Sequence, residues 1–378
     1  MDFTDVLGLT FIKKHLQQSA DLGRIPHAQL FVGAEGSGTL PMALAYAQYI
    51  LCKSSNDEKS CKLKCSKLMH PDLHFAFPIA KNEEVKKDVV SNSFLADWRN
   101  FLALNPYGNL FDWLQFIGIE NKQGIINVDE AEQIVKSLKL KSYEGGYKVM
   151  IIWMAEKMNT SAANKLLKLI EEPPAQTVFL LITENEEQII TTIRSRCQVL
   201  HFPVLSEEDL VKGLLQKTEL NESESIIIAQ QANGNFNKAL KITQNNSNDT
   251  LFEEWFITWV RHAFLAKGNA TVISQLVEWS EQIAGKGRET QKQFLHYCLL
   301  FFRQALLQNY TVSELVFLKP KTENFKFNSF AKYIHGANIV DIVKELDDAI
   351  YHIERNGNAR IIFLDLSIKL TRLLHKKE

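Results

Sequence analysis

Along the first half of the chain, short runs of consecutive apolar residues alternate with stretches whose apolar residues recur at helical spacing. The strand-like runs lie at 27–32, 148–154 and 178–183, and helical stretches lie between them at 40–51 and 161–172. Strands that are apolar on both faces and separated by helices are typical of a parallel sheet covered by helices on both sides. The pattern therefore predicts an α/β domain.

Beyond Pro203 the strand-like runs stop and helical spacing dominates. Ser206, with Asp209 three residues later, resembles a capping box and predicts the start of a helix. The polar stretch 245–249 interrupts the pattern and predicts a linker. We therefore predict three domains, namely an α/β domain at 1–205, a small helical domain at 206–246 and a larger helical domain at 250–378.

The composition excludes several classes of protein. A hydrophobic content of 46% with 23% charged residues is ordinary for a globular protein, and 43 basic against 44 acidic residues exclude a strongly basic DNA-coating protein. The longest apolar runs reach about seven residues, far short of the ~20 that a membrane span needs. The first residues lack a signal-peptide pattern, and five cysteines do not indicate a disulfide framework. We expect a cytoplasmic protein without membrane association.

A glycine-rich segment follows the first strand-like run and precedes a helical stretch. Gly33, Gly36 and Gly38 lie in the context of a P-loop, whose pattern is G-x-x-x-x-G-K-[ST] and whose backbone N–H groups surround a phosphate. Thr39 replaces the lysine that should reach the β- and γ-phosphates, and Leu40 replaces the hydroxyl that should hold Mg²⁺. We interpret the segment as a relic P-loop that does not bind ATP. The alternative is a glycine-rich turn without any binding role.

The acidic residues of a Walker B strand are missing as well. Trp153 and Met154 follow the second apolar run, where Asp-Glu would contact the metal and polarise water. Glu156 lies three residues past the expected position. We interpret Glu156 as a solvated charge at the entry of the next helix rather than as a displaced catalytic acid.

Several segments resemble the AAA+ clamp-loader subunits of bacterial DNA polymerase III. They are FTDVLG at 3–8, RIPHAQLF at 24–31, NKLLKLIEEPP at 164–174 and TTIRSRCQ at 191–198, with a weaker similarity at 356–370. The resemblance implies an α/β AAA+ fold of the P-loop type, followed by a small helical lid domain and an all-α collar domain that serves oligomerisation.

The resemblance also implies roles for individual residues. The delta-prime type of subunit is expected to lack ATPase residues, and Asn237 stands where ATP-binding members carry the sensor-2 arginine. Arg196, next to Ser195, corresponds to an arginine finger that acts in trans on the γ-phosphate bound by a neighbouring subunit. The alternative for Arg196 is a salt bridge that ties the strand end to the lid.

These features together predict a non-hydrolysing subunit of a ring that loads the sliding clamp on primed DNA. The expected partners are clamp-loader subunits of the tau/gamma and delta types, with the clamp and DNA reached through the complex. A first alternative is an ATP-hydrolysing tau/gamma-type motor, which would need lysine at position 39 and Asp-Glu at 153–154. A second is a stand-alone nucleic-acid binder, which would need a basic charge balance.

Three cysteines follow the first helix of the α/β pattern. The family often carries a four-cysteine zinc module here, whereas this chain has only Cys52, Cys61 and Cys65 nearby. His70 is the nearest candidate for a fourth ligand, because Zn²⁺ accepts a Cys₃His set. These residues are therefore a candidate zinc site, and the alternative is an eroded module with ordinary thiols.

The stretch 94–116 is rich in aromatic residues that recur at helical spacing. We predict a small insertion packed against the α/β core. The alternative is a platform on which the bases of a single strand would stack.

Overall fold

The computed structural model describes residues 1–53, 55, 57–87, 89–119, 122–144, 146–244, 249–312, 315–318, 320, 322 and 325–377. The chain divides into two compact units, Met1–Ile119 with Gln123–Asn245, and Glu120–Lys122 with Asn246–Glu378. The finer division into three domains stays a prediction. The predicted linker at 245–249 lies almost wholly outside the described residues.

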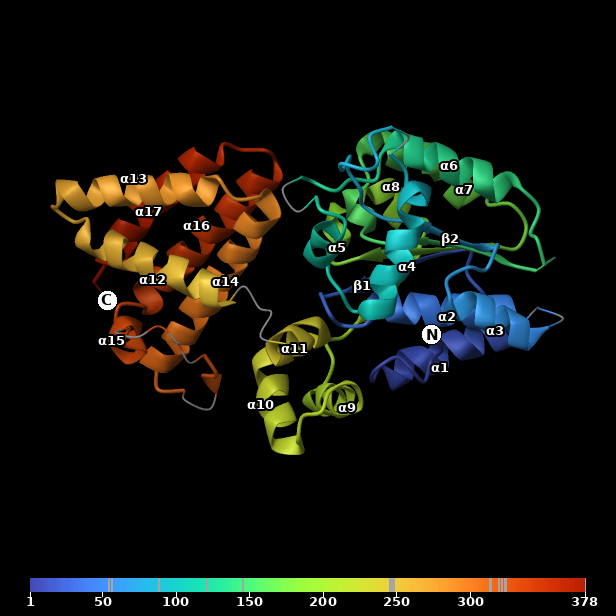
Figure 1. The fold of residues 1–378 in the computed structure, drawn as a ribbon, viewed down its shortest axis with the longest axis horizontal. Coiled ribbons are helices and arrows are strands. Elements are labelled where there is room, and N and C mark those ends of the chain that lie inside the picture. The colour runs from blue at the N-terminus through green and yellow to red at the C-terminus, as the bar shows by residue number, and fades with distance from the viewer. Residues whose placement is uncertain are drawn as a thin grey trace. The chain divides into compact units, whose positions relative to one another are not determined.

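A five-stranded parallel sheet, in the order β2-β3-β4-β1-β5, forms the centre of the first unit (Figure 1). Its strands are β1 (Ala28–Gly33), β2 (Leu73–Ala76), β3 (Lys148–Ile152), β4 (Thr177–Thr183) and β5 (Gln198–Phe202). The three predicted apolar runs form β1, β3 and β4, the inner strands of the sheet. This arrangement confirms the α/β class predicted from the sequence.

Helices cover both faces of this sheet, with α6 and α7 on one face and α1, α2 and α3 on the other (Figure 1). The longer helices of the first unit are α1 (Thr10–Asp21), α2 (Thr39–Lys53), α3 (Glu58–Ser66), α4 (Leu95–Leu104), α5 (Leu110–Phe116), α6 (Val128–Lys139), α7 (Thr160–Glu171), α9 (Glu207–Lys217), α10 (Glu222–Ala232) and α11 (Phe236–Thr243). Short helical turns are η1 (Ser91–Phe94), η2 (Ala155–Lys157), η3 (Glu186–Gln188) and α8 (Thr191–Arg194).

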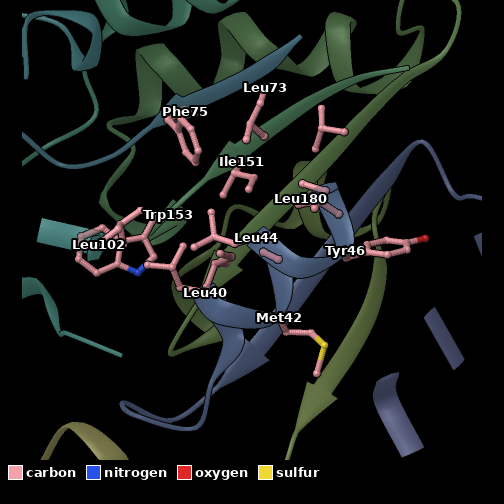
Figure 2. Packing of buried hydrophobic residues seen from close by; sticks show 14 of the residues in the cluster. Leu40, Met42, Leu44, Tyr46, Leu73, Phe75, Leu102, Ile151, Trp153 and Leu180 are labelled. Carbon is pink, nitrogen blue, oxygen red and sulfur yellow. The ribbon is translucent and has the colours of Figure 1, made fainter. Parts of the chain in front are cut away.

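Alternate residues of each inner strand enter two different apolar cores. In β4, Leu180 belongs to the core shared with α2, whereas Phe179 belongs to the core shared with α6 and α7. Figure 2 shows Leu40 and Leu44 of α2 near Ile151 and Leu180 of the sheet. Since successive side chains of a strand point to opposite faces, a strand buried on both sides reads as a continuous apolar run.

The aromatic stretch 94–116 forms α4 and α5 and packs against the α/β core, as predicted. Trp98 and Trp113 are fully buried, with ring centroids 5.1 Å apart in an edge-to-face arrangement. Phe77 stacks on Trp98 at 4.3 Å, and Trp113 Nε1 donates a hydrogen bond to Pro78 O at 2.8 Å. These rings are therefore not available for stacking with nucleic-acid bases.

A buried carboxylate joins α6 to the segment that leads into this insertion. Glu130 Oε2 accepts a hydrogen bond from Ser91 N at 2.5 Å, and Ser91 Oγ accepts one from Phe77 N at 3.0 Å. Burial raises the pKa of Glu130 to about 7, from an ordinary value of 4.5. Between these two values the folded chain holds a proton that the unfolded chain releases, so the free energy of unfolding falls as the pH rises through this range.

We therefore expect Glu130→Gln to remove this pH dependence. The difference in unfolding free energy between the variant and the wild type should change with pH. As the pH rises from about 4.5 to about 8, it should shift by roughly 1–3 kcal/mol in favour of the variant, measured by urea unfolding across that range. Glu132→Gln is the matched control, because Glu132 is half-buried on the same helix and its hydrogen bond with Lys165 lowers its pKa. A difference between Glu130→Gln and wild type that does not change with pH would contradict the prediction.

The second unit is built from helices around one apolar core, as the fold prediction required. Its helices are α12 (Asp249–Leu265), α13 (Ala270–Ala284), α14 (Arg288–Asn309), α15 (Phe327–Ala331), α16 (Gly336–Glu354) and α17 (Ala359–Leu373). Trp259 stacks on Trp279 with ring centroids 5.1 Å apart, and its Nε1 donates to Ser367 Oγ at 2.8 Å. Across the described part of both units, no helix combines the length and hydrophobicity that crossing a bilayer requires.

Candidate functional site

The phosphate loop, residues 33–40, connects β1 to α2. Gly36 and Gly38 have φ of +70° and +93°, in the left-handed region that favours glycine. A Cβ at Gly33 would lie 2.7 Å from Ser37 Oγ, closer than real contacts allow. The three glycines singled out in the sequence therefore shape one tight loop at the end of a strand, in the position expected of a P-loop.

The helical segment α9–α11 closes onto this loop. Phe236 N donates to Gly36 O at 3.2 Å, and Asn235 Nδ2 donates to Glu35 Oε1 at 3.1 Å. A Cβ at Gly36 would lie 2.0 Å from Asn235 Oδ1. The same segment shares an apolar cluster with Leu7 and Tyr107 of the α/β part, so within the first unit the lid helices pack directly over the phosphate loop.

The cavity left at the loop is about 20 Å³, which is room for about one water molecule. Its lining includes Leu40 and Trp153, which occupy the positions of the metal-binding hydroxyl and of the Walker B acid. Both side chains are buried in the core drawn in Figure 2. Among the residues that the structure describes, the charged members of the lining are Glu35 and Glu184, and none is a lysine or arginine. The negative charge of these two carboxylates disfavours a polyphosphate.

Asn237, at the sensor-2 position, connects α11 to the aromatic insertion at 94–116. Asn237 is fully buried, and its Nδ2 donates to Asp112 Oδ2 at 2.7 Å. Its Oδ1 accepts from Asn105 Nδ2 at 2.6 Å, and Lys241 Nζ lies 2.6 Å from Asp112 Oδ1. In this chain the side chain at the sensor-2 position is therefore hydrogen-bonded to the aromatic insertion at 94–116, where the resemblance implies a contact with nucleotide in ATP-binding members.

Glu156 corrects one expectation from the sequence. Its carboxyl group is not solvated, because Oε2 is buried and burial raises the pKa of the group. Oε1 accepts from Glu184 N at 3.4 Å. The helical turn η2 folds Glu156 back beside the end of β4, which a reading of local sequence could not reveal.

Arg196 lies between α8 and β5, two residues before the strand begins at Gln198. Its Nη1 donates to Thr192 O at 2.9 Å, and its Nε lies 3.2 Å from Glu171 Oε2, with 34% of the arginine side chain exposed. Ser195 Oγ donates to Thr192 O at 3.3 Å. The guanidinium is thus oriented by its own chain and still accessible, a geometry compatible with an arginine finger. Its ion pair joins it to the end of α7 rather than to the predicted lid at 206–246, so this contact is not the salt bridge to the lid that was the alternative.

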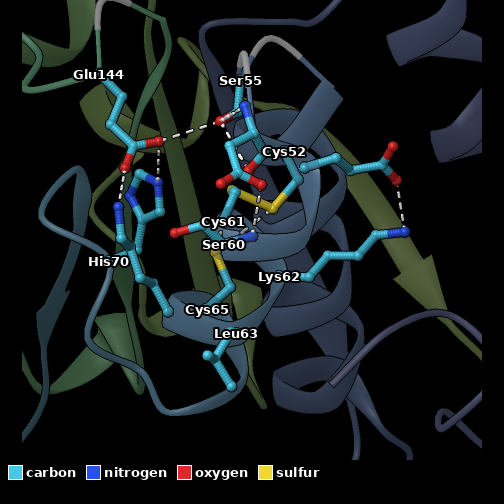
Figure 3. The surroundings of a disulfide bond; sticks show 12 residues. Cys52, Ser55, Ser60, Cys61, Lys62, Leu63, Cys65, His70 and Glu144 are labelled. Atoms are coloured by element: carbon cyan, nitrogen blue, oxygen red, sulfur yellow. Dashed lines mark hydrogen bonds and ion pairs between the residues drawn. A yellow bond between two sulfur atoms is a disulfide. The ribbon is translucent and has the colours of Figure 1, made fainter.

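The three cysteines lie together at the junction of α2 and α3 (Figure 3). The sequence does not indicate a disulfide framework, and the structure joins one pair, Cys52 and Cys61, so these two are not the ordinary thiols of the alternative. The turn between the two helices brings their Cα atoms to 5.4 Å, inside the range that a disulfide requires. Cys65 Sγ lies 3.9 Å from Cys52 Sγ and 4.0 Å from Cys61 Sγ.

The cluster fits zinc only when this disulfide is reduced. Tetrahedral zinc with Zn–S bonds of about 2.3 Å separates its sulfurs by about 3.8 Å, which matches both distances from Cys65 but not a bonded pair. His70 groups with Cys61 and Glu144 rather than with all three cysteines. Its Nε2 faces Glu144 Oε2 at 3.3 Å, and its Nδ1 accepts from Asp72 N at 3.2 Å. His70, the candidate fourth zinc ligand, is therefore already hydrogen-bonded through both ring nitrogens.

The fold and this loop define a AAA+-type α/β protein whose phosphate site is closed, followed by a helical C-terminal part. A family model described as "DNA polymerase III, delta subunit" matches residues 8–206, more than half of the chain. The chain therefore belongs to this clamp-loader AAA+ family of DNA polymerase III.

Individual relatives carry several subunit names. Subunit tau of Bacillus subtilis (strain 168) is 23% identical over 390 residues, which cover 99% of this chain and 62% of the relative. Subunit delta' of the same organism is 28% identical over 240 residues, 62% of this chain and 59% of the relative. Subunit delta' of Escherichia coli (strain K12) is 23% identical over 301 residues, 79% of this chain and 75% of the relative. The chain thus spans about 60% of the length of the first two.

Proposed function

We propose that this chain is a non-hydrolysing, delta-prime-type subunit of the DNA polymerase III clamp loader. In this role it is a structural member of a cytoplasmic ring that loads the sliding clamp on primed DNA during replication. Its partners are subunits of the tau/gamma and delta types, and Arg196 supplies an arginine finger to an ATPase site on a neighbour. The clamp and the DNA are reached through the assembled ring.

The closed phosphate loop is the observation that carries this proposal. Thr39, Leu40 and Trp153 stand where the cation, the metal ligand and the acid of an ATPase would stand, and the remaining cavity of about 20 Å³ has no room for a nucleotide. Asn237 is tied to Asp112 instead of facing a phosphate. A tau/gamma-type motor, the alternative among the relatives, requires an open and cationic site at the same place.

Calorimetric titration of the full-length chain with Mg-ATP tests this proposal. We expect no binding at millimolar nucleotide. We also expect none after Thr39→Lys and Leu40→Thr are combined, because Trp153 and the contact of Phe236 with Gly36 still fill the site. Micromolar affinity and steady hydrolysis by the wild-type chain would overturn the proposal in favour of a motor subunit.

Zinc is proposed for the reduced form of the cysteine cluster. The protein purified under reducing conditions is expected to hold about one zinc ion per chain, bound through Cys52, Cys61 and Cys65. Cys65→Ser should release the metal, whereas Cys197→Ser, outside the cluster, should retain it. Metal analysis that finds no zinc in the reduced wild-type protein, together with a count of free thiols, would contradict this proposal.

A further inference from the structure

The cysteine cluster at the junction of α2 and α3 holds one more sulfur than a structural disulfide needs (Figure 3). Cys52 and Cys61 are bonded to each other. The free thiol of Cys65 lies 3.9 Å from Cys52 Sγ and 4.0 Å from Cys61 Sγ. Because one disulfide is enough to join the two helices, a third sulfur at this distance indicates a second state of the cluster in which it takes part.

Metal binding by all three sulfurs and the disulfide exclude each other. Three thiolates bound to one zinc ion lie about 3.8 Å apart, whereas a disulfide leaves two of the sulfurs without the thiolate form that a metal ligand needs. The Sγ of Cys61 lies within 4.8 Å of the sulfurs of Cys52 and Cys65, and also of ligand atoms of His70 and Glu144. Oxidation of Cys61 therefore removes a ligand from both groups.

Cys52 borders a pocket on the surface of the first unit. Among the described residues of the lining, Cys52 is the one cysteine, beside Phe3, Tyr49 of α2 and Lys62 of α3. The volume of the pocket is about 420 Å³, within the range of roughly 300–1,000 Å³ that small molecules occupy. Cys52 is therefore the sulfur at which a small thiol or disulfide would react.

The expected compartment also favours a reversible bond. Under the proposed function the chain works in the cytoplasm, where thiols are kept reduced. Disulfides that form there are usually transient and serve catalysis or redox sensing. A pair of cysteines that is bonded in one state and binds a metal in the other fits redox sensing.

We propose that this cluster is a reversible redox switch that controls zinc binding, an inference that rests on the zinc site of the proposed function. In the reduced chain, the thiolates of Cys52, Cys61 and Cys65 hold the ion. In the oxidised chain, Cys52 and Cys61 form the disulfide and Cys65 is left as a single free thiol that holds no metal. The oxidant is a small disulfide of the glutathione class.

Oxidation proceeds by two thiol–disulfide exchanges. The Cys52 thiolate attacks one sulfur of the small disulfide, which breaks its S–S bond and releases one thiolate. The Cys61 thiolate then attacks Cys52 Sγ in the mixed disulfide, which forms the Cys52–Cys61 bond and releases the second thiolate. Two electrons thus pass from the two cysteines to the small disulfide. Cys65 then releases Zn²⁺ with its charge unchanged and takes up a proton from water.

Zinc release and disulfide formation, measured together on the full-length chain, test this inference. The reduced, zinc-loaded protein is treated with oxidised glutathione, and the released metal is followed with a chromophoric chelator. We expect about one zinc ion per chain to be released, while the thiols counted in denaturant fall from five to three. Dithiothreitol with added Zn²⁺ should restore both values.

Peptide mapping identifies the sulfurs that react. Trypsin places the three cysteines on separate peptides, because lysines lie between them along the chain, and a Cys52–Cys61 link is the expected product. Cys65→Ser should hold no zinc and still form this link. Cys197→Ser is the matched control outside the cluster and should release zinc as the wild type does.

Three results would overturn the switch. Zinc that stays bound in oxidised glutathione, with five thiols still counted, would leave the zinc site of the proposed function intact as a purely structural one. A disulfide that dithiothreitol does not reduce in the folded chain would be a permanent cross-link. A reduced chain without zinc would end the zinc site and the switch together. The titration with Mg-ATP tests the clamp-loader role independently of all three.

Discussion

In a reconstituted clamp loader, Arg196→Ala is expected to lower ATP turnover at the adjoining site of the neighbouring subunit by at least about 100-fold. The guanidinium is always charged and binds phosphate oxygens through two donors, so it can stabilise the charge that develops during phosphoryl transfer. Contacts with Thr192 O and Glu171 orient it already in the isolated chain. Total turnover of the complex should fall less, because only one of several sites loses its finger. The measurement is steady-state ATP hydrolysis together with clamp loading.

Two further variants separate this role from that of a structural salt bridge. Arg196→Lys keeps the charge but not the forked geometry, so its complex should assemble and recover little of the turnover. Glu171→Gln removes the carboxylate partner and should leave most of the turnover in place. Unchanged hydrolysis by a fully assembled Arg196→Ala complex would rule out the finger, and failure to assemble would favour the salt bridge.

Trp113→Ala is expected to lower the free energy of unfolding of the first unit by about 4 kcal/mol. The indole is fully buried among Trp98, Phe77 and Phe101, so alanine leaves a cavity. It also leaves Pro78 O without its hydrogen-bond donor. Urea unfolding followed by circular dichroism measures the loss, with separate transitions for the two units where they are resolved.

Phe116→Ala is the matched control in the same helix. This ring is 40% exposed, and its removal should cost less than about 1 kcal/mol. Trp113→Phe retains most of the packing and should cost roughly half as much as alanine. Similar losses for Trp113→Ala and Phe116→Ala would show that the insertion is not part of the core.

The parts of the fold that could be predicted from the sequence are those whose burial is complete. Strands β1, β3 and β4 are apolar on both faces, and their composition alone distinguishes them. The edge strands were not predicted, because β2 has only four residues and β5 exposes Gln198 and His201. The start of α9 was easier to predict, since Ser206 caps this helix through its own side chain, and this signal is local.

At the phosphate loop, the sequence alone could predict only which ATPase side chains are missing. The sequence shows that the lysine, the hydroxyl and the Walker B acids of an ATPase are absent, and it marks the loop. It does not show what fills their place, because Asn237 and Asp112 lie 125 residues apart along the chain. Likewise, the burial of Glu156 and the approach of Cys52 to Cys61 depend on how the backbone turns after a strand or a helix. Such contacts follow from tertiary packing rather than from local pattern.

Under the proposed function, the contact of Phe236 with Gly36 has a consequence for how the chain responds to ATP and ADP. A ligand shifts a conformational equilibrium only by the difference between its affinities for the two states. A nucleotide that has no room in the closed site offers no such difference, so under the proposed function the ratio of ATP to ADP does not bias the position of α9–α11. Movements of a ring during its cycle would then originate in other subunits. The first unit of this chain would follow them as one rigid body.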